Sequence, residues 1–177
     1  MNQEVADVLA ELAGPDAERI HLGRFIGGVV YALQQYEHMA IATPKEIQSD
    51  EFYQNEFMGL LSALQGGLAP PSNWLRGFFY NAAIMRLDAA WERSLRVVLR
   101  DTSKKANGPE LYKKLCQSEP TLPEYDKSIF KQVRRELNAL KHKAEGPSGD
   151  IREEPAILRT GLEDLLSLVK RRVISAA

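Results

Sequence analysis

The chain has 177 residues, of which 44% are hydrophobic and 27% charged, a composition that fits one globular domain and excludes an intrinsically disordered chain. Its formal net charge of −1 and its pI near 6.3 exclude a protein whose overall field attracts nucleic acid, so an RNA contact would need a local basic patch. A single cysteine excludes an internal disulfide. Because we find neither a secretory signal nor a membrane-spanning run, we expect a cytoplasmic protein with no membrane partner.

Glycine and proline pairs divide the sequence into segments of helical periodicity, and strand patterns are absent. We therefore expect an all-α fold. In chain order, the predicted helices span residues 3–13, 16–40, 51–64, 73–101, 109–117, 124–144 and 155–174. The second of these contains Gly27 and Gly28 in its middle, where close packing or a kink is expected.

The predicted helix over 73–101 is apolar around most of its circumference, as is typical of a helix surrounded by others. The sequence therefore predicts an up-and-down helical bundle around a long central helix, with all 177 residues in one domain and the helices of residues 1–65 packed on the bundle. The residues expected in its core are Trp74, Phe78, Phe79, Ala82, Ala83, Leu87, Ala90, Trp91, Leu95 and Val98.

The predicted helix over 124–144 has an apolar stripe on one side and a polar column on the other. The stripe consists of Ile129, Val133, Leu137, Leu140 and Ala144. The column consists of Lys131, Arg135, Asn138 and His142, at spacings of four, three and four. Periodicity alone favours a solvated helix surface. Two features also point to a site: Asn138 is a poor helix former, and His142 lies in the last turn, where the helix dipole favours an imidazolium.

The segment from Arg135 to His142, RELNALKH, resembles the Arg-x(4–6)-His motif of the HEPN superfamily in its six-spacer form, and residues 70–175 are similar to that superfamily in their order of helices. The resemblance implies a four-to-five-helix bundle that dimerises and brings the Arg and His of two protomers into one site. It also implies a metal-independent endoribonuclease, often a toxin or defence component, in which the ribose 2′-hydroxyl attacks the adjacent phosphate.

Carried onto this chain, the resemblance makes Arg135 the residue that binds and polarises the phosphate and His142 the general acid or base. The remaining polar positions of the helix would line the binding face: Glu136, Asn138, Lys131 and Lys141. Glu136 stands where Asn, Asp or His is more usual in the superfamily. The partners implied are a second copy of the chain, RNA, and an antitoxin or a nucleotidyltransferase.

Two other functions stay open. Some members of the superfamily are non-catalytic and bind nucleotides or act as partner subunits. A small-molecule pocket near Tyr80, Trp91 and Trp74 is a third interpretation, but no polar constellation supports it. We expect no cofactor or metal, because neither His21 nor His38 has a second ligand at metal spacing and no glycine-rich phosphate loop is present.

The predicted central helix also carries Arg86, Arg93 and Arg100 at spacings of seven, with Arg96 nearby. These arginines could track RNA phosphates, but pairing with acids on the rim of the core is the favoured interpretation. An alternative for Glu92 is that it is the buried partner of an arginine near the motif helix. Cys116 is expected to be a half-buried small residue rather than a nucleophile.

Overall fold

The computed structural model describes residues 2–14, 16–42, 72–101, 106–142 and 156–175, and all regular elements within them are helical. This confirms the predicted all-α bundle. The elements are α1 (Asn2–Leu12), α2 (Ala17–Ala42), α4 (Ser72–Leu99), α5 (Gly108–Ser118), the 3₁₀ turn η1 (Tyr125–Lys127), α6 (Ile129–His142), α7 (Ala156–Val169) and the π-helical turn η2 (Lys170–Ile174). The predicted helix over 51–64 and the expected boundary near residue 65 lie outside the described residues.

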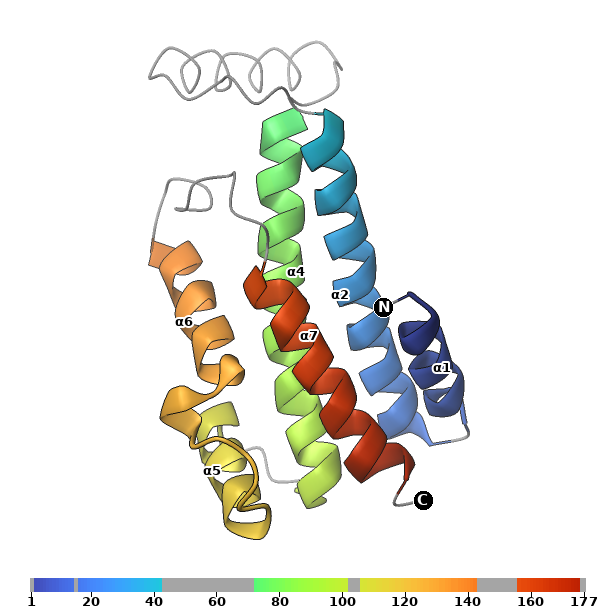
Figure 1. Cartoon of the computed structure of the whole chain (residues 1–177), viewed down its shortest axis with the longest axis vertical. Helices are drawn as coiled ribbons and strands as arrows, with labels where there is room; N and C mark the ends of the chain where they lie inside the picture. The colour runs from blue at the N-terminus through green and yellow to red at the C-terminus, as the bar shows by residue number, and fades with distance from the viewer. Residues whose placement is uncertain (1, 15, 43–71, 102–105, 143–155, 176–177) are drawn as a thin grey trace.

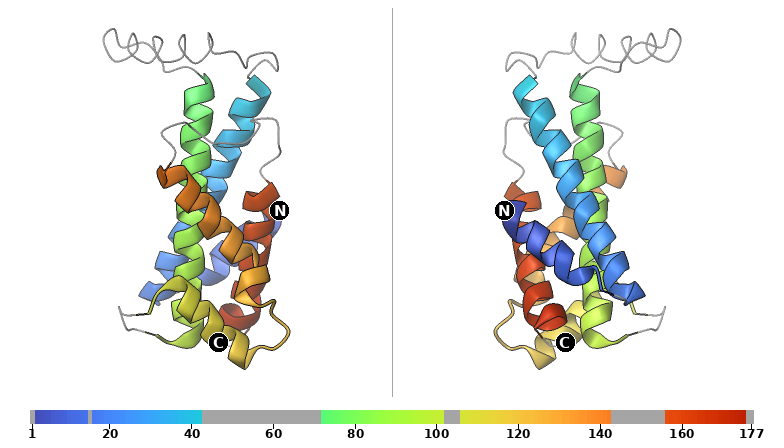
Figure 2. Two further views of the ribbon diagram at one scale, coloured as in Figure 1. Left: turned by 90° about the vertical axis from the view of Figure 1, so that its left-hand side faces the viewer. Right: turned by 90° about the vertical axis from the view of Figure 1, so that its right-hand side faces the viewer.

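The helices α2 and α4 form a long antiparallel pair, and the other elements are arranged around it (Figure 1). Helix α7 crosses one face of α4, while α5 and α6 follow the side of α4 that is turned away from α2 (Figure 2). Helix α1 packs on the N-terminal half of α2 and also contacts α7. Residues of α2 are therefore integral to the bundle, since α2 covers much of the length of α4.

The core is centred on α4. Five residues predicted to lie there are at most 3% exposed: Ala83, Leu87, Ala90, Trp91 and Leu95. Three more are half-buried: Phe79, Ala82 and Val98. The side chains of Trp74 and Phe78 lie outside the described set. The helix is nevertheless not surrounded on every side, because Met85 is 58% exposed.

Helix α4 ends at Leu99, two residues before the predicted end, because Arg100 adopts a left-handed backbone conformation with φ of 50°. The amide of Asp101 then donates a hydrogen bond to the carbonyl of Arg96, at 3.0 Å, which closes the last turn. Such an ending normally carries glycine, since a side chain at positive φ costs energy. Because arginine stands where glycine is usual, the sequence does not indicate that α4 ends at this position.

At Gly161, helix α7 packs directly against side chains of α4 and α6. A Cβ atom built on Gly161 would lie 2.8 Å from Leu87 Cδ2 and 3.2 Å from Val133 Cγ2, so no larger residue fits without movement. The buried Trp91 Nε1–H donates a hydrogen bond to the Gly161 carbonyl at 3.1 Å. This crossing joins α4, α6 and α7 at one point of the core.

Helix α5 begins with a capping box at Asn107. The Asn107 side chain accepts from the Glu110 amide, and the Glu110 carboxylate accepts in return from the Asn107 amide. An aromatic cluster then fastens α5 and η1 to the bundle, with ring centroids 5.5 to 6.2 Å apart. Its members are Trp91, Tyr112, Tyr125 and Phe130.

Candidate functional site

Helix α6, which carries the HEPN-like motif, begins at Ile129 and not at residue 124 as predicted. Residues 125–127 form the 3₁₀ turn η1, and Ser128 then caps α6. The Lys131 amide donates to Ser128 Oγ at 3.2 Å, while the Ser128 hydroxyl donates to the Tyr125 carbonyl at 2.7 Å. Serine is a preferred N-cap residue, so Ser128 is the sequence signal that would have placed the start correctly.

One side of α6 is packed into the core. Val133 and Leu137 are 0% and 7% exposed, as predicted, while Ile129 and Leu140 are half-buried and Ala144 lies outside the described residues. The predicted stripe omits its largest member. Phe130 is fully buried and stacks on Trp91 with ring centroids 5.5 Å apart.

The opposite side of α6 presents Arg135 and Asn138 to solvent. Because they are three residues apart, they are separated by only about 60° around the helix axis. Neither side chain forms an ion pair or a hydrogen bond with another described residue. Helix α6 ends at His142, seven residues after Arg135 and on the same side by helical phase; the side chains of His142 and Lys141 lie outside the described set.

Lys131 does not belong to this open surface. Its ammonium group forms an ion pair with Asp126 of η1 and so fastens the 3₁₀ turn to the first turn of α6. The hydrogen bond from Lys131 holds the pKa of the Asp126 carboxyl below its ordinary value. The predicted binding residue Lys131 is thus engaged in positioning the start of the helix.

Glu136 is likewise turned toward the bundle. The Tyr80 hydroxyl of α4 donates a hydrogen bond to Glu136 Oε1 at 3.1 Å, and the ring centroids of Tyr80 and the buried Tyr36 of α2 lie 5.6 Å apart. Burial, followed by the nearby Glu136 carboxylate, raises the pKa of Tyr80 well above its ordinary value, so the hydroxyl remains a donor. Glu136 therefore connects α6 to α4 and is not part of the column that contains Arg135.

Arg134, a residue that the sequence analysis did not single out, is the cation that joins α6 to α4. Its Nη1 atom lies 3.6 Å from Asp88 Oδ1 and 3.5 Å from Glu92 Oε2. The contact with Arg134 bears out the expectation that Glu92 pairs with an arginine of the motif helix, although Glu92 is half-buried and not buried. Glu92 also pairs with Arg96 of its own helix at 3.0 Å. Because Asp88 is only 9% exposed, this network places a carboxylate and a guanidinium inside the contact between the two helices.

The arginines of α4 divide between the two interpretations given for them. Arg93 forms an ion pair with Glu18 of α2, and Arg96 pairs with Glu92 and donates to the Ala106 carbonyl at 2.7 Å. These two support the favoured interpretation. Arg86 and Arg100 are exposed, and neither has an acidic partner among the described residues.

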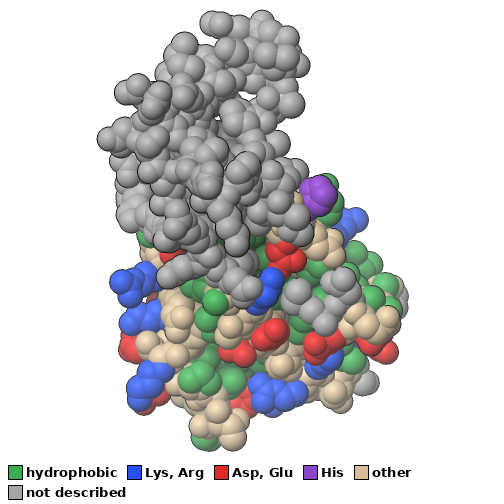
Figure 3. Space-filling model, turned by 45° about the horizontal axis from the view of Figure 1, so that its top comes forward, with side chains coloured by type: hydrophobic (Ala, Val, Ile, Leu, Met, Phe, Trp, Pro, Cys, Tyr) green, Lys and Arg blue, Asp and Glu red, His purple; other side chains and the backbone are tan. Residues whose placement is uncertain are grey.

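Basic and acidic side chains are interspersed among the described residues that are visible in Figure 3. No described helix combines the length and the apolar character needed to cross a bilayer. Within the described ranges, no group of three or more His, Cys, Asp or Glu is arranged to hold a metal ion. Cys116 is half-buried, as expected, and burial raises the pKa of its thiol, which disfavours the nucleophilic thiolate.

Comparison of the chain with models of protein families, with curated proteins and with solved structures finds no match. The resemblance to the HEPN superfamily therefore stays a prediction that depends on the motif helix and on the order of helices.

Proposed function

We propose that this chain is an HEPN-type RNA-processing protein that binds an RNA phosphate on the outward side of α6 and cleaves the adjacent phosphodiester bond without a metal ion. One observation carries the proposal. Arg135 presents an exposed guanidinium with no described partner, whereas the neighbouring Arg134 and Glu136 are both engaged with α4. A planar guanidinium on a rigid helix is well suited to hold a phosphate through two hydrogen bonds.

In the proposed reaction the ribose 2′-oxygen forms a bond to phosphorus and the bond from phosphorus to the 5′-oxygen breaks. The products are a 2′,3′-cyclic phosphate and a 5′-hydroxyl, so no water or metal is consumed. Arg135 stabilises the negative charge that develops on the phosphate, and His142 transfers a proton as general acid or base. Asn138, beside Arg135, supplies an amide that can orient the ribose or the base.

The proposed active form is a homodimer joined through this side of α6. A single exposed helix face does not enclose a substrate or exclude water from it. Because Arg135 and Asn138 point away from their own core, a second copy can approach them without disturbing the fold. A two-fold contact would then bring two Arg135 and two His142 residues into one site.

The test is cleavage of total RNA by wild type, Arg135→Ala and His142→Ala, with Arg171→Ala as the matched control. Arg171 is also an exposed arginine, but it lies on η2 beyond the C-terminal end of α7. We expect each of the first two variants to lose roughly 100-fold or more of the cleavage rate, and Arg171→Ala and added EDTA to leave it unchanged. Equal cleavage by all four proteins would refute the catalytic roles.

One feature favours the alternative of a non-catalytic partner or nucleotide-binding subunit in a toxin–antitoxin or nucleotidyltransferase system. Glu136 directly follows Arg135, where Asn, Asp or His is more usual in the superfamily, and its carboxylate accepts a hydrogen bond from Tyr80 of α4 instead of facing the proposed phosphate site. This alternative predicts that the wild type does not cleave RNA, and that the double variant Arg135→Ala/His142→Ala changes association with a partner at unchanged RNA binding.

A further inference from the structure

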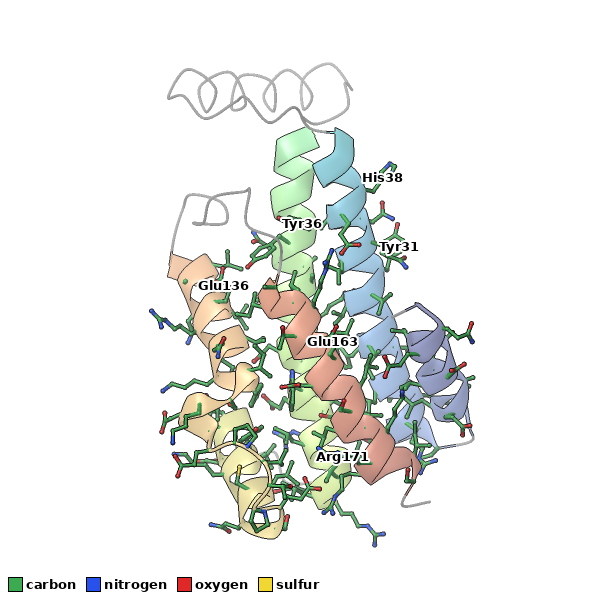
Figure 4. The ribbon with its side chains drawn as sticks, in the orientation of Figure 1. Tyr31, Tyr36, His38, Glu136, Glu163 and Arg171 are labelled. Atoms are coloured by element: carbon green, nitrogen blue, oxygen red, sulfur yellow. The ribbon has the colours of Figure 1, made fainter. Side chains whose placement is uncertain are left out.

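A second surface, on the outer side of α2, combines a highly exposed aromatic ring with arginines. Tyr31 is 60% exposed, although most large apolar residues of the described helices are buried. Figure 4 shows that Tyr31 projects from the side of α2 that is turned away from α4 and α6. Arg24 and Gly28 lie seven and three residues before it, so the three positions share an arc of about 60° around α2.

Gly28 allows an arginine of α4 to lie against α2 within this arc. A Cβ atom built on Gly28 would lie 2.7 Å from Arg86 Cδ and 2.9 Å from Arg86 Nη1. The Arg86 side chain therefore runs directly over the Gly28 backbone, where any other residue would displace it. Arg86 is exposed, and its guanidinium lies next to the stretch of α2 that runs from Arg24 to Tyr31.

The charge on this surface is not balanced. Of its arginines, Arg93 is paired with Glu18. Arg24 lies between the Glu18 contact and the Gly28 contact along α2, and neither Arg24 nor Arg86 has an ion-pair partner among the described residues. The surface is therefore the kind of local basic patch that a chain of net charge −1 needs in order to bind a polyanion.

We propose that Arg24, Arg86 and Tyr31 form a binding surface for single-stranded nucleic acid. The two guanidinium groups contact successive phosphates, and a base stacks on the open face of Tyr31, about 10 Å along α2 from Arg24. A single strand fits better than a duplex, because only unpaired bases offer a free face to an aromatic ring. The surface is separate from the motif, since α2 and α6 lie on opposite sides of α4 (Figure 2).

Binding is tested by fluorescence anisotropy with a short labelled oligo(dT) at several salt concentrations. DNA lacks the 2′-hydroxyl that the proposed cleavage requires, so this probe reports the α2 surface whether or not the chain cleaves RNA. We expect Tyr31→Ala to weaken binding roughly 5- to 100-fold and Tyr31→Phe to retain it. We also expect the pair Arg24→Gln/Arg86→Gln to reduce the salt dependence by about two ion contacts, whereas Arg171→Gln leaves it unchanged.

Gly28→Ala provides a further variant that alters no charge and no aromatic ring. Its new methyl group displaces Arg86, so we expect weaker oligo(dT) binding at unchanged helix content by circular dichroism. Wild-type affinity in Tyr31→Ala and in the double arginine variant would overturn the proposal. It would also be overturned if Tyr31→Ala dissociated a dimer in sedimentation experiments without changing oligo(dT) affinity, because the surface would then join two copies of the chain.

Discussion

Replacement of Gly161 by alanine tests how closely α7 packs on α4 and α6. The added methyl group would lie 2.8 Å from Leu87 Cδ2 and 3.2 Å from Val133 Cγ2, whereas carbon atoms normally pack about 3.5–4.0 Å apart. Leu87 and Val133 are fully buried, so a shift of either side chain displaces the residues packed around it. Overpacking of this kind costs about 1–3 kcal/mol, and alanine returns about 1 kcal/mol through its higher helix propensity. If α7 moves outward instead, the hydrogen bond from Trp91 to the Gly161 carbonyl is lost, at a further cost of about 1 kcal/mol. We therefore expect a net loss of up to about 2 kcal/mol, and no gain in stability.

Gly28→Ala is the matched control, because it gains the same helix propensity at a position where the obstructing atom can move. The methyl group meets only the Arg86 side chain, which is exposed and can swing into solvent. We expect Gly28→Ala to raise the free energy of unfolding by up to about 1 kcal/mol. Urea unfolding followed by circular dichroism measures both variants through the midpoint at constant slope. If Gly161→Ala stabilised the chain as much as Gly28→Ala, the account of the helix crossing would be wrong.

Three further predictions concern the α4–α6 network, the end of α4 and the alkaline limit of stability. Arg134→Ala should lower the free energy of unfolding by about 2 kcal/mol, because it leaves the buried carboxylate of Asp88 beside that of Glu92 without their shared cation; an unchanged urea midpoint would contradict this. Arg100→Gly should raise the free energy of unfolding by about 1 kcal/mol, because glycine adopts the observed φ of 50° without strain. A lower melting temperature in this variant would count against the prediction. Burial raises the pKa of Tyr112 from 10.0 to about 12, so the unfolded chain releases this proton first and stability falls as the pH rises from 10 to 12. Tyr112→Phe should reduce that decline in an alkaline series of unfolding measurements, and an equally steep decline would show that Tyr112 does not cause it.

The fold class could be predicted because the relevant signals are local. Helical periodicity and Gly-Pro punctuation placed the described helices to within a few residues, apart from the start of α6. The errors occur where one residue acts against its usual preference. Arg100 ends α4 in a conformation that glycine normally adopts, and Ser128 begins α6 after a 3₁₀ turn that mimics a helical start.

The partners of polar residues were harder to predict, because they depend on how helices meet. Periodicity shows that Glu136 and Lys131 are outside the apolar stripe. It does not show that Glu136 accepts a hydrogen bond from Tyr80, or that Lys131 pairs with Asp126. The surface around Tyr31 was missed for the same reason. Its arginines come from two different helices, and the approach of Arg86 to Gly28 places them on one surface.

Substitutions of the adjacent residues Arg134 and Arg135 distinguish an effect on stability from an effect on RNA cleavage. They differ by about 100° around α6, so one guanidinium lies against Asp88 and Glu92 while the other faces solvent. Loss of Arg134 removes a contact inside the bundle, and its effect on RNA follows from reduced stability. Loss of Arg135 removes no ion pair or hydrogen bond with a described residue, so a change in RNA cleavage at an unchanged unfolding midpoint points to the outward surface. If Arg135→Ala instead destabilised the chain as much as Arg134→Ala, Arg135 would have a structural role and the proposed phosphate site would lose its main support.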